Sequence, residues 1–267
     1  MLAYTSVYYP SPVQDISPML PELTPEELAA GLDRVALEIL AEAGVEAPPV
    51  DAFAVARRLG IAVALDDCQS GRARYVRLAD RRTRRPRAAI LLRSEPRRER
   101  QQWALAHEIG EHAAHRMFLL FGVDPRETAA NAREEVANRL AGRILLPTAW
   151  FAADAAACNW DLMALKARYA TASHELIVRR MLECRPPIII SIFDQRRISF
   201  RRSNLRGRVP PLSAAETACW REVHQGNRPR QTQDGPRLVQ GWPVHEEGWQ
   251  REILRTEVAE FDADTCE

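Results

Sequence analysis

The residues best suited to chemistry are two histidines, His107 and His112, which bracket Glu108 in the segment from Trp103 to His115. The apolar residues among them predict a single helix with one buried side. Two imidazoles and a carboxylate on one helix are the groups with which zinc hydrolases hold their metal and position a general base. We therefore expect a Zn2+ site with His107 and His112 as ligands and Glu108 as the general base.

The spacing of these histidines departs from the usual zinc motif. In H-E-x-x-H the histidines are four positions apart, about 40° around a helix. His112 is five positions after His107, an offset of about 140° in a regular helix. A one-residue π-bulge would bring the rings together, and such bulges concentrate at functional sites; the H-E-x-x-G-H motif of the dipeptidyl peptidase III family is similar in spacing. We favour the bulge. The alternative is that Glu111, at the fourth position, is the second ligand, with His115 a more distant candidate.

Composition indicates an ordinary globular protein. The 267 residues are 46% hydrophobic and 27% charged, with a formal net charge of +1, which gives no general attraction to nucleic acid or membranes. The five cysteines are scattered without a C-x-x-C pair, a pattern typical of reduced thiols in a cytosolic protein. No apolar run approaches the length of a membrane span. We expect a cytoplasmic protein without a membrane anchor.

The chain before the histidines predicts a small helical and sheet unit. Residues 1–23 are a leader rich in proline, serine and tyrosine, and the capping box T-P-E-E at 24–27 starts a helix that continues to about residue 43. A second helix is expected over 52–59. Compact apolar runs then predict an antiparallel sheet, with strands at 61–65, 74–78 and 88–92. The basic turn at 80–87 is interpreted as a solvated hairpin tip, the alternative being a patch for an acidic partner.

The chain after the histidines predicts further helices and a hairpin. A second long helix should end at Pro147. Two short amphipathic helices, at 160–169 and 173–182, have the outline of a helix-turn-helix. A β-hairpin is expected at 188–200, and a proline linker follows it. The later W-P-V-H-E-E-G-W stretch at 242–249 is interpreted as a surface loop, with ligand binding as the alternative.

Two motifs in this arrangement resemble a known family. The segment A-H-E-I-G at 106–110 and the segment E-E-V-A-N-R-L-A-G-R-I-L-L-P at 134–147 are together similar to the ImmA/IrrE family of zinc-dependent endopeptidases. The segment P-P-V-D-A-F-A-V-A-R-R-L-G-I at 48–61 is similar to the N-terminal helix and first strand of that family. The resemblance extends over roughly residues 24–205. It departs from the family at Glu111, where the family normally has histidine.

The resemblance implies that Glu134, on the second helix, is the third metal ligand. The chemistry agrees in kind, because a hydrolytic zinc ion is usually held by three protein ligands with one position left open. Glu135 is the alternate, being adjacent on the same turn. Without the upstream histidines, this pair of glutamates would be interpreted as an exposed acidic face that balances Arg133 and Arg139.

We therefore predict an α+β fold: a zincin-like peptidase core of helices packed on a small antiparallel sheet, followed by the helix-turn-helix-like pair and the hairpin. The expected divisions are a leader (1–23), a metallopeptidase domain (24–157), the helical pair with the hairpin (158–208) and a C-terminal extension (209–267).

The resemblance implies a zinc-dependent endopeptidase that cleaves a regulatory protein, typically a helix-turn-helix repressor, in response to stress or mobile-element signals. The alternative is a catalytically degenerate relative that acts as a regulatory module and binds protein or nucleic acid through its helical pair and arginine clusters. The altered histidine spacing is the reason to keep this second hypothesis.

Overall fold

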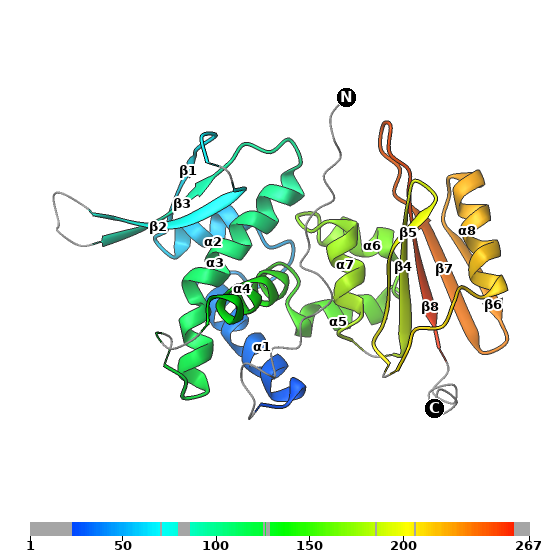
Figure 1. Cartoon of the computed structure of the whole chain (residues 1–267), viewed down its shortest axis with the longest axis horizontal. Helices are drawn as coiled ribbons and strands as arrows, with labels where there is room; N and C mark the ends of the chain where they lie inside the picture. Colours follow the sequence, from blue (N-terminus) through cyan, green and yellow to red (C-terminus); the bar gives the residue numbers. More distant parts are fainter. Residues whose placement is uncertain are drawn as a thin grey trace. The chain divides into compact units, whose positions relative to one another are not determined.

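The computed structural model describes residues 23–69, 71–79, 86–124, 126, 129–184, 186–205 and 207–258. The chain divides into two compact units, Met1–Phe151 and Ala152–Glu267, whose elements are labelled in Figure 1. The leader and the basic turn at 80–85 lie outside the described residues. Each unit is described by itself.

The first unit begins with the two predicted helices. Helix α1 (Pro25–Glu42) starts with the expected capping box, in which Thr24 and Glu27 satisfy each other's backbone N–H groups. Its buried face includes Leu32 and Ile39. Helix α2 (Ala52–Arg58) is capped by Asp51, whose carboxylate accepts from the backbone N–H of Phe53.

A three-stranded sheet follows, in the order β1-β3-β2. Strands β2 (Ala73–Ala79) and β3 (Pro86–Leu92) are antiparallel, as predicted. Strand β1 (Ala62–Leu65) pairs parallel to β3 instead. The sheet is therefore mixed and not purely antiparallel, because β3 has a parallel neighbour, β1, on one side and an antiparallel neighbour, β2, on the other. This order leaves β2 at an edge of the sheet.

Two long helices complete the core of the first unit. Helix α3 (Arg98–Leu120) carries the histidines, and helix α4 (Ala130–Leu145) packs against it and against α1. Buried apolar residues such as Leu105 and Ile109 of α3 and Val136 of α4 form the shared core. Burial of these side chains fixes the separation of the two helices and so positions the polar groups on their facing sides.

The second unit contains short helices and a large sheet. Helix α5 (Thr148–Ala157), which sequence reasoning missed, spans the division between the units. Helices α6 (Leu162–Arg168) and α7 (His174–Met181) are the expected pair, and Ser173 caps α7 as predicted.

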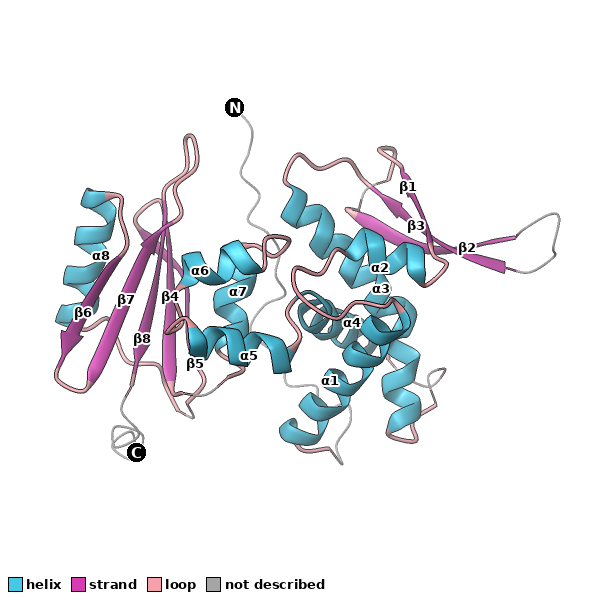
Figure 2. Ribbon diagram, turned by 180° about the vertical axis from the view of Figure 1, so that it is seen from behind, coloured by secondary structure: helices cyan, strands magenta, loops and turns pink. Residues whose placement is uncertain are grey.

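The sheet of the second unit is five-stranded, with the order β5-β4-β8-β7-β6. The predicted hairpin supplies β4 (Ile188–Asp194) and β5 (Arg197–Ser203). Strands β6 (Arg230–Asp234), β7 (Arg237–Pro243) and β8 (Arg251–Glu257) complete it. Helix α8 (Ala214–Gly226) packs on β6, β7 and β8 (Figure 2).

This sheet does not follow the divisions expected from sequence. We placed a boundary at residue 208, between the hairpin and a C-terminal extension, yet β4 pairs along its whole length with β8. The two segments therefore share one sheet. The proline-rich linker connects elements of a single unit, and such linkers alone do not show where a hydrophobic core ends.

Candidate functional site

Helix α3 does not contain the π-bulge that we favoured. It is α-helical from Arg98 to Leu120, so His107 and His112 point in different directions around it. Nδ1 of His112 is hydrogen-bonded to the phenolic oxygen of Tyr75 at 2.9 Å, and the two rings lie 5.2 Å apart. The structure therefore separates His112 from the candidate metal site and engages it with strand β2.

Glu111, four positions after His107, lies where we had expected the second ligand, His112, to be. One ligand atom from each of His107, Glu111 and Glu134 lies within 4.8 Å of the others. Nε2 of His107 is 3.5 Å from Oε1 of Glu134. The regular α-helix explains this grouping, because residues four positions apart lie on the same face. The alternative kept for Glu111 thus matches the geometry better than the bulge.

Asn138 orients the first histidine of this group. Its Oδ1 is 2.9 Å from Nδ1 of His107, and its Nδ2 donates to Oε1 of Glu134 at 3.4 Å. A hydrogen bond at Nδ1 leaves the lone pair of Nε2 directed toward Glu134. Asn138 is four positions after Glu134 on α4, so both side chains reach His107 from one helical face.

A glycine brings the two helices close enough for this arrangement. A Cβ atom at Gly110 of α3 would lie 2.6 Å from the carbonyl oxygen of Ala137 on α4. That distance is far below van der Waals contact, and the atom it meets belongs to rigid helical backbone. Gly110 therefore permits the close approach of α4 that carries Glu134 and Asn138 to His107.

Glu108 lies directly beside the group and is only 6% exposed. Its Oε2 accepts a hydrogen bond of 2.6 Å from the backbone N–H of Tyr75 on β2. Burial raises the pKa of Glu108 above its ordinary value, and the negative charges of Glu111 and Glu134 raise it further, against the lowering effects of His107 and the Tyr75 hydrogen bond. A raised pKa brings a carboxylate closer to the range in which it can accept and return a proton.

The remaining predicted candidates lie outside the group. Nδ1 of His115 is hydrogen-bonded to the backbone carbonyl of His112, and its side chain is exposed. Glu135 is paired with Arg139 at 2.9 Å. Neither residue belongs to the groups that could hold a metal in the described part of the chain.

Sequence reasoning missed the roles of Tyr75, Gly110 and Asn138. Asn138 carried a usable signal, because its spacing from Glu134 puts both on one face of a predicted helix. Gly110 stands in the middle of a helical pattern, where a glycine often marks a close packing contact. Tyr75 gave no signal, since nothing in its strand indicates that a backbone amide faces the histidine helix.

The donor set suits a divalent metal ion. One imidazole nitrogen and two carboxylates are ligands that Zn2+ accepts, and the set is richer in oxygen than two histidines and one carboxylate would be. Asn138 supplies the outer hydrogen bond that a metal-bound histidine usually has. The residues present therefore fit a metal centre.

Comparison with known proteins supports this view of the first unit. Residues 56–181 match the family model of the IrrE N-terminal-like domain, which belongs to peptidase family M78. This region of the chain is similar to an IrrE N-terminal-like domain. The predicted resemblance to the ImmA/IrrE family is thereby confirmed, and so is the predicted α+β class. The IrrE-like domain includes α3 and α4, and with them all of the residues of the candidate metal site.

A solved structure shares the wider fold. A Mycobacterium tuberculosis transcriptional regulator is 18% identical, with a TM-score of 0.58 over 93% of this chain and 81% of its own. At this identity the likeness concerns the fold alone. No curated protein matches the sequence at a significant level.

Among the helices of the described residues, none combines the length and the apolar character that crossing a bilayer requires.

Proposed function

We propose that the IrrE-like domain is a metal-dependent endopeptidase with His107, Glu111 and Glu134 as its Zn2+ ligands. The observation that carries this proposal is the convergence of these three side chains beside a buried Glu108. The match of residues 56–181 to a peptidase family model supports the reaction class. His112, His115 and Glu135 are not included in this ligand set.

Glu108 is the general base of the proposed reaction. When bound, the metal ion supplies Lewis-acid chemistry that acidifies water and polarises the scissile carbonyl. The hydrogen bond from the Tyr75 amide holds one oxygen of Glu108 in place, which leaves the other to take a proton from the attacking water. The same carboxyl group then returns the proton to the leaving amine.

The edge position of β2 supports a polypeptide substrate. The strand pairs with β3 along one side, and Tyr75 in its middle donates its N–H to Glu108. A substrate segment that adds to this edge in extended form would run directly past the general base. Such binding requires a substrate segment that can leave its own secondary structure, so we expect cleavage in a loop or linker.

The substrate class follows from the resemblance to the ImmA/IrrE family. We propose that the substrate is a regulatory protein, and in particular a helix-turn-helix transcriptional repressor. The similar fold of a transcriptional regulator from Mycobacterium tuberculosis is compatible with a role in regulation. Cleavage of a repressor would link peptidase activity to transcription under stress, in the cytoplasm.

The alternative function, a DNA-binding module without catalysis, finds less support. Six of the eight residues of α7, the helix that would read DNA, are buried. Glu175 of this helix is paired with Arg251 of β8, and Arg179 stacks over the ring of Phe200. A recognition helix needs an exposed face for the major groove, and α7 uses its polar residues within its own unit.

Metal analysis and cleavage assays test the proposed function together. The full chain, purified without chelator, should contain a Zn2+ equivalent whose binding depends on His107, and it should cut a candidate repressor encoded nearby. Glu108→Gln should retain the metal and lose cleavage. His107→Ala should lose cleavage and the Zn2+ equivalent of this centre, whereas the matched control His115→Ala should lose neither.

One variant separates the two ligand geometries. His112→Ala should retain the metal, because His112 contacts Tyr75 and not the ligand group. Loss of the metal in a folded His112→Ala protein would show that the proposed ligand set is wrong. A folded wild-type protein in which neither metal nor cleavage depends on His107 would reject the peptidase function itself.

A further inference from the structure

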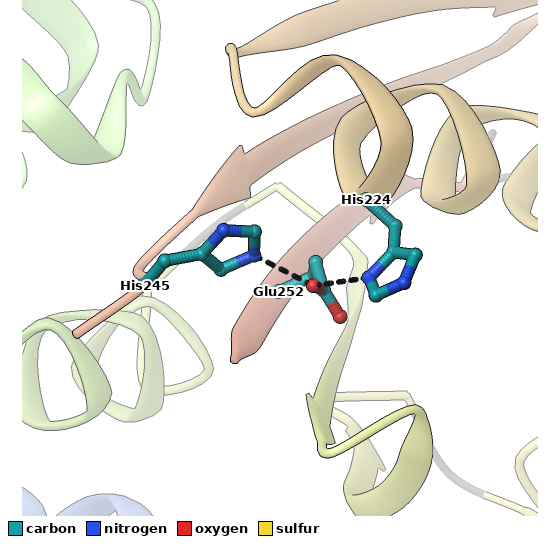
Figure 3. A group of neighbouring side chains, drawn as sticks. All are labelled: His224, His245 and Glu252. Carbon is teal, nitrogen blue, oxygen red and sulfur yellow. Dashed lines mark hydrogen bonds and ion pairs between the residues drawn. The ribbon is translucent and has the colours of Figure 1, made fainter. Parts of the chain in front are cut away.

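A second group of metal-type ligands lies in the second unit. His224, His245 and Glu252 each place a ligand atom within 4.8 Å of the others. Figure 3 shows both imidazoles directed at one carboxylate. Oε1 of Glu252 accepts from Nδ1 of His224 at 2.8 Å and from Nε2 of His245 at 2.7 Å.

Three different elements deliver these side chains. His224 is in the last turn of α8, His245 follows β7, and Glu252 is in β8. Glu252 lies on the same face of β8 as Leu254, which packs in the core beneath α8 with Val223. A carboxylate thus lies beside the apolar cluster that α8 covers.

The carboxylate is fully buried and positioned in advance. Glu252 has 0% exposure, whereas the side chains of His224 and His245 are 19% and 16% exposed. The indole N–H of Trp220 donates to Oε2 of Glu252 at 3.1 Å, which leaves Oε1 for the histidines. The Trp220 ring also stacks on His224, with centroids 5.7 Å apart, and so fixes the plane of that imidazole.

The charge of this group requires a positive partner. Within the described part of the chain, the side-chain partners of Glu252 are His224, His245 and Trp220. A buried carboxylate is costly unless a cation or a protonated group balances it. The structure offers two ways to do so: an imidazolium, or a metal ion that both histidines and the carboxylate bind.

We propose that His224, His245 and Glu252 form a second site for a divalent transition metal such as Zn2+. Two imidazoles and one carboxylate are a common ligand set for such ions, and three protein ligands leave a position open. With metal–ligand bonds of about 2.0–2.2 Å, neighbouring ligand atoms lie only slightly farther apart than the nitrogen and oxygen atoms of the two hydrogen bonds observed here. The ion replaces the shared protons and joins α8 to the β7–β8 connection.

The stretch at 242–249, which we interpreted as a surface loop, begins instead inside β7, where Trp242 is buried. The indole of Trp242 donates to Asp161, and that of Trp249 donates to Asp194. His245 therefore lies in a connection anchored on both sides, and the ligand-binding alternative is the one that this proposal adopts. No residue of the peptidase centre takes part.

Metal stoichiometry of the full chain tests the second site. After removal of metal with a chelator, the protein is titrated with Zn2+, and with Co2+ for its visible absorption bands. The His107→Ala, Glu134→Gln double variant lacks two of the three ligands of the first centre and should still bind one equivalent. Adding His245→Gln should weaken that binding by more than the about 10- to 100-fold typical of losing a supporting hydrogen bond.

Suitable variants keep the hydrogen bonds and remove the metal ligand. Gln at 245 and Asn at 224 each retain an N–H that can donate to Glu252, so circular dichroism of both metal-free variants should match the wild type. Both substitutions should also abolish the rise in melting temperature that Zn2+ gives the double variant. Equal Zn2+ affinity with and without His245→Gln would overturn the proposal.

The outcomes distinguish the two metal centres. If the folded double variant binds no stoichiometric Zn2+ or Co2+, the second site is overturned. If the wild type binds one equivalent in that case, the ligand set of the first centre is still supported. A wild-type protein that binds one equivalent and keeps it in the double variant supports the second site and contradicts the ligand set of the proposed peptidase.

Discussion

Replacing Gly110 with alanine tests whether close helix packing creates the candidate peptidase centre. The added Cβ would lie 2.6 Å from the Ala137 carbonyl oxygen, whereas ordinary contact begins at 3.4 Å. The two helices must therefore separate by about 0.8 Å, since the clash is with backbone and no side chain can turn away. Glu134 and Asn138 lie on either side of Ala137 and would move away from His107 with it.

The expected magnitude combines two opposing effects. Alanine is better than glycine in a helix interior by about 1 kcal/mol. Overpacking a tight interior costs about 1–3 kcal/mol, and a contact with rigid backbone belongs at the upper end. We therefore expect Gly110→Ala to lower the free energy of unfolding by about 1–2 kcal/mol. The shift of Glu134 and Asn138 should weaken metal binding by about 10- to 100-fold, as for other losses of ligand support.

Gly142 provides the matched control. It is in the neighbouring helix α4, and a Cβ there meets nothing within 4 Å. Gly142→Ala should therefore raise the free energy of unfolding by about 1 kcal/mol and leave metal affinity unchanged. Denaturant unfolding gives the stabilities, and competition with a chromophoric chelator gives the metal affinities. Wild-type metal affinity in Gly110→Ala would refute the argument that this contact holds the ligands together.

Three further predictions concern single residues. Glu111→His restores the four-residue histidine spacing and should tighten Zn2+ binding by about tenfold, because zinc favours imidazole ligands; weaker binding in the chelator competition would contradict the geometry. Asn138→Ala removes the hydrogen bond that orients His107 and should cost about 10- to 100-fold in metal affinity, so an unchanged affinity would exclude this role. Burial raises the pKa of Glu216, but hydrogen bonds from Arg201, Ser213 and Thr256 outweigh it, and the net pKa is lowered. A carboxyl group with a lowered pKa stabilises the fold at pH values above the titration range of glutamate, and this contribution is lost as the pH falls below that range. In urea unfolding, Glu216→Gln should therefore lower the free energy of unfolding by about 3–5 kcal/mol at neutral pH, and by progressively less below about pH 4. A difference between variant and wild type that does not change with pH would refute this.

Local signals in the sequence predicted the elements that carry strong caps and regular patterns. The boundaries of α1 and α7 follow from Thr24 and Ser173, whose side chains satisfy the first backbone N–H groups of their helices. The hairpin β4–β5 follows from a continuous apolar run before a polar turn. These features depend on a few neighbouring residues and so can be recognised without the rest of the fold.

Pairings between distant segments could not be predicted in this way. Strands β6 and β8 contain many polar residues. One of them, Arg255 of β8, is buried and donates a hydrogen bond to Gln240 on β7. Its burial depends on the partner strand, which local pattern does not reveal. The parallel pairing of β1 with β3 could not be predicted for the same reason, since it depends on the order of the strands in the folded sheet.

The candidate site shows the same division between local and distant information. Glu108 was identified from its position beside His107, and Glu134 from a motif on the next helix. The choice between Glu111 and His112 depended on whether α3 was regular, and regularity is a property of the folded helix packed against its neighbours. The Tyr75 amide on Glu108 joins residues 33 positions apart and was outside the reach of any local pattern.

The position of β8 has a consequence for biosynthesis. This strand is the last of the five in the sequence and the central one in the sheet, between β4 and β7. While the chain emerges from the ribosome, the two hairpins on either side exist as separate pieces with unpaired edges, which can associate with other chains. The unit can close only when residues 251–257 have left the exit tunnel, so a nascent chain that has not yet exposed them is prone to aggregate.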